Sequence, residues 1–248
     1  METETVPRCP ICGKEGLPWK SHTFINDLTV CDIKLDRCTH CDTIYQNPRM
    51  TRPEMDRYYR EGKYRKTYGV VISKERGDWQ TMFLSTLKIT PKRCLDVGCS
   101  RGYLLWSLKK KFGTEILGLD LLVDHTLIDE IVGSKRDVKG LFDLVVSSHQ
   151  LEHTYDPNEE LKWMISKLAP NGVLFLELPL RHKIVLPHTY IFTRKSIDVM
   201  LKAAGMKYLY IDMEESCEIL AQREQEAGKF LQDGVTVLKV IEKPVYCG

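Results

Sequence analysis

The chain has 248 residues, of which 43% are hydrophobic and 28% charged, and its formal net charge is +2. This length suits one large domain, or a domain of about 150–200 residues with a small appendage, and the near-neutral charge gives no electrostatic support for a nucleic-acid-binding protein. The sequence starts without the basic and apolar regions of a signal peptide, and no apolar run approaches the roughly 18 residues of a membrane span. The nine cysteines are an odd number without a secretion signal, so we expect free thiols and a cytoplasmic location.

Two C-x-x-C pairs open the chain, Cys9 with Cys12 and Cys38 with Cys41, separated by 25 residues. Four thiolates at this spacing are typical of a closed tetrahedral Zn²⁺ site, which predicts a structural zinc ribbon over residues 1–48. The segment between the pairs is strand-like and too polar to fold alone, so a metal would supply much of its folding energy. Two alternatives remain, a redox-active C-x-x-C motif and His40 in place of one cysteine as ligand.

The excess of positive charge lies in residues 49–90, which carry 10 basic and 5 acidic side chains. Their pattern is helical, and Thr51 or Arg52 followed by Pro53 and Glu54 is typical of a helix start. Tyrosines interleaved with basic residues predict a lid that closes over a ligand, with an amphipathic connector packed on the core as the alternative. These residues are Tyr58, Tyr59, Tyr64, Tyr68, Arg57, Arg60, Arg65 and Lys66.

A short buried strand at 93–96 leads into a tight turn that contains Gly98 and Gly102, and an apolar helix follows. Such a turn aims backbone N–H groups and a helix N-terminus at whatever lies above the strand end, and glycines let a ligand come close. Asp120 ends the next predicted strand, where a carboxylate can bind both ribose hydroxyls of a nucleoside. The glycine spacing G-x-x-x-G differs from the G-x-G-x-x-G of a dinucleotide site.

Residues 91–248 alternate short apolar runs with helical segments, which predicts an α/β fold with a doubly wound, mostly parallel sheet. We expect helices at 103–111, 158–168 and 193–204, and strands at 93–96, 115–120, 142–147, 172–178, 208–213 and 234–241, with a further helix between the last two strands.

In combination, these segments resemble class I S-adenosylmethionine-dependent methyltransferases. Residues 95–102 look like motif I of that family, and residues 118–120 look like its ribose-binding strand end. Residues 142–157 resemble its fourth strand with the Glu-His…Asp-Pro segment, and Ala169-Pro-Asn-Gly172 and 188–206 resemble the segments before strands five and six. The cysteine pairs and the Tyr-Tyr pattern upstream are similar to methyltransferases that act on sugars and natural products. The resemblance implies a Rossmann-like, seven-stranded-type sheet.

The resemblance also implies S-adenosylmethionine as cofactor. The cofactor-binding residues that it implies are Asp96, Gly98, Cys99, Ser100, Gly102, Asp120, Leu121 and Ser148. Two features depart from the family pattern. Ser100 stands where a glycine is usual, and the link from Asp120 to Phe142 is short, with only Asp129 and Asp137 as candidates for an acidic residue at the adenine edge.

The loop after the 142–147 strand carries the catalytic candidates His149, Glu152 and His153. A histidine titrates near neutral pH and can take a proton from an acceptor, so we favour His149 over His153 as base, with a hydrogen-bonded structural histidine as the alternative for each. His182, His188 and Tyr190 are further candidates. The run also matches the H-x-x-E-H pattern of zinc peptidases, but that motif needs a helix, and here it follows a strand.

The sequence therefore predicts methyl transfer from S-adenosylmethionine to a small molecule, with a sugar or nucleotide-linked sugar as first choice. The positive segment 49–90 would suit a phosphate on that substrate. One alternative is an RNA methyltransferase that uses the ribbon to hold RNA, although the neutral charge counts against nucleic acid. Another is a zinc-ribbon binding protein that has lost catalysis, suggested by the shortened 120–142 link.

Overall fold

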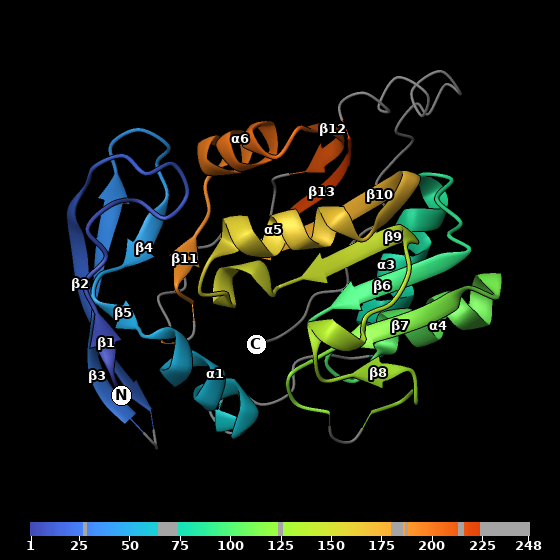
Figure 1. The fold of residues 1–248 in the computed structure, drawn as a ribbon, viewed down its shortest axis with the longest axis horizontal. Coiled ribbons are helices and arrows are strands. Elements are labelled where there is room, and N and C mark those ends of the chain that lie inside the picture. Colours follow the sequence, from blue (N-terminus) through green and yellow to red (C-terminus); the bar gives the residue numbers. More distant parts are fainter. Residues whose placement is uncertain are drawn as a thin grey trace.

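The computed structural model describes residues 1–26, 29–63, 74–123, 126–179, 186, 188–212 and 216–223. In this part of the chain, an antiparallel N-terminal sheet stands beside a larger α/β unit (Figure 1). No helix among these residues is long and apolar enough to cross a membrane. Several predictions lie outside the described residues: those for Tyr64, Arg65, Lys66, Tyr68, His182 and the strand at 234–241.

The larger sheet has seven strands in the order β12-β13-β10-β9-β6-β7-β8. Their bounds are β6 (Arg93–Val97), β7 (Glu115–Leu119), β8 (Ile131–Val132), β9 (Phe142–Ser148), β10 (Leu168–Pro179), β12 (Met206–Asp212) and β13 (Ser216–Arg223). The five strands from β10 to β8 are parallel, whereas β13 runs antiparallel to both of its neighbours. The predicted mostly parallel, seven-stranded sheet is confirmed.

Helices cover both faces of this sheet, as a doubly wound fold requires. α3 (Lys74–Thr86) and α4 (Tyr103–Phe112) lie on one face, and α5 (Pro157–Ser166) and α6 (Arg194–Ala203) on the other. Because side chains alternate along a strand, Leu144 and Val146 of β9 pack with α3 and α4, while Val145 packs with α5 and α6. All three side chains are fully buried, which is why the strand reads as one apolar run.

The helix predicted between the last two strands does not include Ser216–Arg223, and residues 224–233 lie outside the described residues. The segment Ser216–Arg223 is strand β13, which pairs with β10 along one edge and with β12 along the other. Two ladders of backbone hydrogen bonds satisfy both sides of the strand, and this tertiary pairing outweighs the local helical pattern.

The N-terminal sheet has the order β11-β4-β3-β2, with bounds β2 (Gly16–Asn26), β3 (Thr29–Cys38), β4 (Ile44–Gln46) and β11 (Tyr190–Ile191). Strand β11 comes from far along the chain. β1 (Thr3–Glu4) and β5 (Arg49–Met50) form a separate pair. Val6, Cys9 and Ile11 belong to the same buried cluster as the residues under α5 and α6, so the predicted ribbon 1–48 shares its core with the methyltransferase-like segment.

Helix α1 (Arg52–Arg60) begins after the N-cap residue Thr51, one of the two residues predicted at the helix start. It lies between the two sheets (Figure 1), and its buried Met55 and Tyr58 pack against the N-terminal sheet. Short 3₁₀ turns follow β8 and β9, η1 at Lys135–Asp137 and η2 at Leu151–His153.

Candidate active site

A cavity of about 780 Å³ opens at the carboxyl ends of β6, β7 and β9, beneath α1. This is the edge at which open α/β sheets bind ligands. All of the residues predicted to bind the cofactor except Gly102 line it, and so do the three predicted catalytic residues: Asp96, Gly98, Cys99, Ser100, Asp120, Leu121, Ser148, His149, Glu152 and His153.

The glycine turn borders the cavity and has the backbone that its sequence predicts. Gly98 has a φ of +76°, and a Cβ there would lie 2.5 Å from Cγ of Gln150. Gly102 has a φ of +80° and is the N-cap of α4, where a Cβ would lie 2.7 Å from Ile128. Gly98 therefore shapes the cavity edge, whereas Gly102 fixes the start of the helix behind it.

Asp120 is held in place by backbone donors. Its Oδ2 accepts a hydrogen bond of 2.7 Å from the Ser100 N–H, and its Oδ1 accepts one of 3.0 Å from the Leu122 N–H. Ser100, which replaces the usual glycine, has a φ of +49°. The carboxylate thus supports a backbone conformation that a non-glycine residue rarely adopts.

Asp96 lies deeper in the cavity wall and is 5% exposed. Burial, with the nearby charge of Asp120 adding to it, raises the pKa of Asp96 to about 7. Among the described residues, its Oδ1 has no hydrogen-bond partner. A buried acceptor of this kind is costly unless a ligand or water donates to it.

A buried polar network, which the sequence pattern did not reveal, joins α3 to the ends of β9 and β10. Arg76 forms an ion pair of 2.9 Å with Glu177 and donates to Oγ of Ser148 at 2.9 Å. The Ser148 hydroxyl and the Gln80 amide each donate to Glu177 at 2.7 Å. Burial would raise the pKa of Glu177, but Arg76 and His149 outweigh it and hold that pKa well below its usual range.

His149 lies between two carboxylates. Its Nδ1 is 3.6 Å from Oε1 of Glu152, and its Nε2 is 3.7 Å from Oε1 of Glu177. Burial would lower the pKa of His149, but the two nearby glutamate carboxylates outweigh it and raise the pKa to about 9. At neutral pH the ring is therefore a cation without a lone pair to accept a proton, which argues against His149 as the base.

Glu152 is the centre of a second cluster, with His153 and His188. One ligand atom from each lies within 4.8 Å of the others, and the His153 and His188 rings meet edge-on at a centroid distance of 4.7 Å. Burial would raise the pKa of Glu152, but His149 and the other histidine charges lower it to about 2. The segment Leu151–His153 is a 3₁₀ turn, so it lacks the α-helix that the H-x-x-E-H peptidase motif needs.

We expect the charge of His149 to make the protein less stable at alkaline pH. A pKa raised in the folded state gives stability that is complete below about pH 6.5, the unfolded value, and is lost as the pH rises through the folded value, which is about 9. Melting temperatures measured between about pH 6.5 and 10 should fall more steeply for the wild type than for His149→Gln. The exposed His22→Gln serves as control, and parallel wild-type and His149→Gln curves would contradict this expectation.

The two described tyrosines of the predicted lid have different surroundings. Tyr58 is 5% exposed and packs in the core beside the N-terminal sheet. Tyr59 lines the cavity, and its ring lies edge-on to His153 at 5.9 Å. Arg60 also lines the cavity, whereas Arg57 pairs with Glu54 on the same helix.

The four N-terminal cysteines come together as predicted. The Sγ atoms of Cys9 and Cys41 are 3.5 Å apart, as are those of Cys12 and Cys38, and all four lie within 4.8 Å of one another. A tetrahedral Zn²⁺ with bonds of about 2.3 Å would place its sulfurs about 3.8 Å apart, so the donor set fits. The closest pairs join the two motifs rather than the cysteines of one C-x-x-C, which disfavours the redox alternative.

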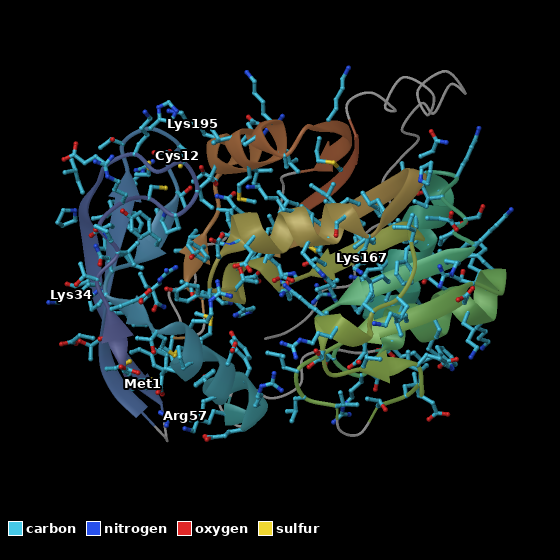
Figure 2. All side chains as sticks on the ribbon, viewed as in Figure 1. Met1, Cys12, Lys34, Arg57, Lys167 and Lys195 are labelled. Carbon is cyan, nitrogen blue, oxygen red and sulfur yellow. The ribbon has the colours of Figure 1, made fainter. Side chains whose placement is uncertain are left out.

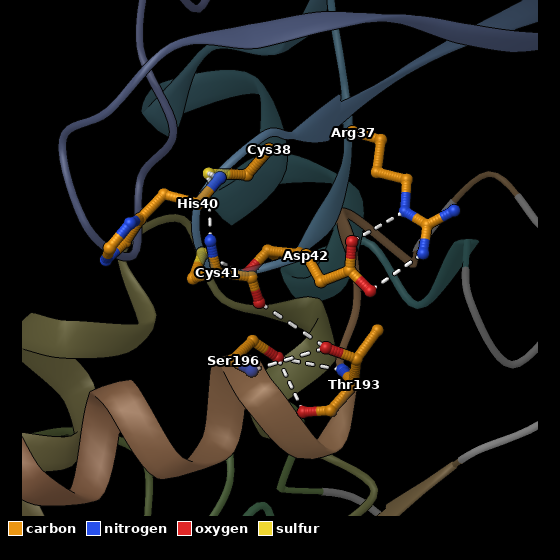
Figure 3. A network of polar contacts seen from close by, with 8 residues as sticks. Arg37, Cys38, His40, Cys41, Asp42, Thr193 and Ser196 are labelled. Atoms are coloured by element: carbon orange, nitrogen blue, oxygen red, sulfur yellow. Dashed lines mark hydrogen bonds and ion pairs between the residues drawn. The ribbon is translucent and has the colours of Figure 1, made fainter.

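The backbone and the α/β unit support this cluster. The N–H groups of His40 and Cys41 both point at the Cys38 sulfur, at 3.4 Å. Figure 3 shows Arg37 holding Asp42 beside the second pair, with Thr193 at the start of α6 donating to the Cys41 carbonyl at 3.5 Å. Asn158 of α5 donates to the carbonyls of Pro10 and Ile11 in the first pair, at 3.0 and 2.9 Å. Figure 2 labels Cys12 on the side of the N-terminal unit that faces α6.

Comparison with known proteins assigns part of the chain to a protein family. The family described as a methyltransferase domain matches residues 78–211, just over half of the chain. A tRNA U34 carboxymethyltransferase of Shewanella frigidimarina is 29% identical over 140 residues, which cover 48% of this chain and 42% of that protein. The mitochondrial ubiquinone biosynthesis O-methyltransferase of Saccharomyces cerevisiae is 35% identical over 99 residues, or 33% and 32% of the two chains. The chain thus spans less than half the length of these relatives.

Solved structures share the fold. The 1,6-didemethyltoxoflavin-N1-methyltransferase of Burkholderia thailandensis superposes with a TM-score of 0.54 at 14% identity, over 83% of this chain and 99% of that one. An S-adenosylmethionine-dependent methyltransferase of Clostridium acetobutylicum superposes with a TM-score of 0.51 at 13% identity, over 65% of this chain and 96% of that one. The family match, the seven-stranded sheet and the cavity at its parallel strand ends agree, and the chain belongs to the family of S-adenosylmethionine-dependent methyltransferase domains.

Proposed function

We propose that the protein transfers the methyl group of S-adenosylmethionine to a small molecule, with a sugar or nucleotide-linked sugar as first choice. The cofactor would lie along the ends of β6, β7 and β9. Asp120 would accept hydrogen bonds from the ribose hydroxyls, and Asp96 from the amino group of the methionine part. Gly98, Cys99, Ser100, Leu121 and Ser148 border the same space. The volume of about 780 Å³ lies in the range of small-ligand sites and leaves room for an acceptor.

S-adenosylmethionine supplies an electrophilic methyl group when bound. The part played by the protein is to orient the acceptor and to remove its proton, and orientation alone supplies much of the rate of such a transfer. The protonated His149, with its two ring nitrogens facing Glu152 and Glu177, would place a positive charge beside the acceptor. His153 or His188, at the other side of the Glu152 carboxylate, would accept the proton.

The burial of the Glu152, His153 and His188 cluster is the observation that supports a small-molecule acceptor. The side chain of His153 is 11% exposed and that of Glu152 is 0% exposed, yet both line the cavity that borders the glycine turn. An acceptor has to enter this cavity to reach them. Arg60 and Arg136 are exposed and also line the cavity, so a phosphate on the acceptor would be attracted to them.

Labelled S-adenosylmethionine and a panel of nucleotide sugars test this proposal. We expect label to enter at least one sugar, with a rate reduced by about 100-fold or more in His153→Gln or in His188→Gln. His149→Gln should keep more activity than the His153→Gln or His188→Gln variant that lacks the base, because it removes a nearby positive charge and leaves the proton acceptor in place. Transfer to no member of the panel would contradict a nucleotide-sugar acceptor.

The second candidate acceptor is RNA, favoured by the relatives named tRNA U34 carboxymethyltransferase. The formal net charge of +2 argues against it, because RNA binding relies on concentrated positive charge. Labelled methyl transfer to bulk tRNA, weakened by added salt, would establish this candidate instead. The non-catalytic alternative rested on the short 120–142 link, but that link forms β8, and its Ser134–Arg136 segment lines the cavity.

We also propose that the ion of the four-cysteine cluster is Zn²⁺ with a structural role. Four sulfur donors leave no open position for a substrate. His40 is outside the group of ligand atoms that lie within 4.8 Å of one another, so the four cysteines suffice as ligands.

A further inference from the structure

The sheet that carries the cysteine cluster also holds one wall of the cavity. Strand β11 pairs with β4, with Tyr190 opposite Tyr45 and Ile191 opposite Ile44. His188, which lines the cavity, lies two residues before the start of this strand. The position of His188 therefore depends on a sheet built mainly from the first 46 residues.

Gln46, at the end of β4, makes the closest connection to this segment. Its side-chain nitrogen donates to the carbonyl oxygens of Leu186 and His188, both at 2.9 Å. Its backbone N–H donates to the carbonyl of Thr189 at 3.0 Å. Gln46 is 5% exposed, and an amide nitrogen carries two protons, so each proton has one carbonyl as partner.

The segment around His188 is also hydrogen-bonded, on its other side, to the loop that follows β9. The Thr189 N–H donates to the carbonyl of Glu152 at 2.9 Å. The backbone at 188–189 thus lies between Gln46 and Glu152, and the His188 ring meets the His153 ring at 4.7 Å. An apolar side chain in place of Gln46 would fill the same space but would leave two carbonyls without these donors.

A displaced His188 would change the surroundings of the Glu152 carboxylate. Glu152 is fully buried, and among the described residues neither of its carboxylate oxygens has a hydrogen-bond partner. Its Oε1 lies 3.6 Å from Nδ1 of His149 and 3.7 Å from Nε2 of His153. A buried charge with such contacts depends on the placement of the surrounding rings.

We propose that Gln46 is a positioning residue of the acceptor site, which holds the backbone carbonyls of Leu186, His188 and Thr189 so that the His188 ring faces His153 and Glu152. The proposal rests on the proposed function, in which this cluster faces the acceptor. It gives the N-terminal sheet a role beyond its own folding, because the cysteine cluster supports β4, and β4 supports the wall of the cavity.

Nuclear magnetic resonance of the full chain tests the proposal without an acceptor. The readout is the nuclear Overhauser effect between ring protons of His153 and His188, assigned with single His→Gln variants. Gln46→Met keeps the length of the side chain and removes its donors. Gln46→Asn keeps an amide but is too short to reach both carbonyls, and it serves if Gln46→Met does not fold. Thr43→Val is the matched control, since Thr43 is buried in the connection between β3 and β4 and its hydroxyl contacts the Cys41 sulfur at 3.0 Å.

We expect the nuclear Overhauser effect between the His153 and His188 rings in the wild type and in Thr43→Val, and we expect its loss in the Gln46 variants. The Kd of these variants for S-adenosylmethionine should change less than twofold. An unchanged effect in both Gln46 variants would overturn the proposal. Equal loss in Thr43→Val would also overturn it, because the cause would then be a general loosening of the sheet. A wild type that does not bind S-adenosylmethionine would overturn the proposed function instead, and the ring contact, which needs no ligand, is measured separately.

Discussion

Asp120→Ala is expected to weaken the binding of S-adenosylmethionine by about 100-fold or more. Hydrogen bonds to a charged group contribute about 1.5–3 kcal/mol each, and the variant would lose the two that we propose Asp120 accepts from the ribose hydroxyls. It also loses the acceptors for the Ser100 and Leu122 N–H groups. Since Ser100 has a φ of +49°, the turn beside the cofactor would relax as well. Isothermal titration calorimetry measures the change.

Asp129→Ala is the matched control for this experiment. The sequence made Asp129 a candidate for the adenine edge, but its side chain is exposed and absent from the cavity lining. Its replacement should leave the affinity within twofold of the wild type. Wild-type affinity in Asp120→Ala would show that the cofactor does not bind at the end of β7.

Cys38→Ser is expected to cause the largest loss of stability. A structural Zn²⁺ site contributes about 10–16 kcal/mol to the folding of small zinc domains, so loss of one ligand removes a substantial part of that energy. We expect bound zinc to fall below one ion per chain and the melting temperature to drop by about 10 °C or more. Metal analysis and thermal unfolding measure the two effects, and a chelator should reproduce them in the wild type.

Cys31→Ser is the control, because Cys31 lies on the same strand as Cys38 and is a free, partly buried thiol outside the cluster. It should keep both the zinc and the melting temperature. A metal-free wild type with an unchanged melting temperature would contradict a structural role for the ion.

Features set by nearby residues were predictable from the sequence. The glycine turn, the Asp120 strand end and the C-x-x-C pairs each have a fixed spacing that reflects local geometry. Even the Asp-Pro pair after the histidines has a local explanation, since Asp156 caps α5 through the Asn158 and Glu159 N–H groups.

Features set by long-range pairing were not predictable. Gln46 donates to carbonyls about 140 positions later in the chain, and Arg76 pairs with Glu177 across two elements. Neither residue belongs to a motif with fixed spacing. The strand β13 was missed for the same reason, since its partners β10 and β12 decide its conformation. The preference for His149 as base depended on its pKa, which the distant Glu177 helps to raise.

The late arrival of β11 constrains how the chain can fold during synthesis. β2, β3 and β4 leave the ribosome within the first 46 residues, but the strand that pairs with β4 ends at Ile191. At about 5–20 residues per second, the edge of β4 waits roughly 7 to 30 seconds for its partner. An unpaired strand edge is a site for association with other chains. If the cysteines bind a metal ion early, the N-terminal sheet would become ordered sooner, although the edge of β4 would still lack its partner strand.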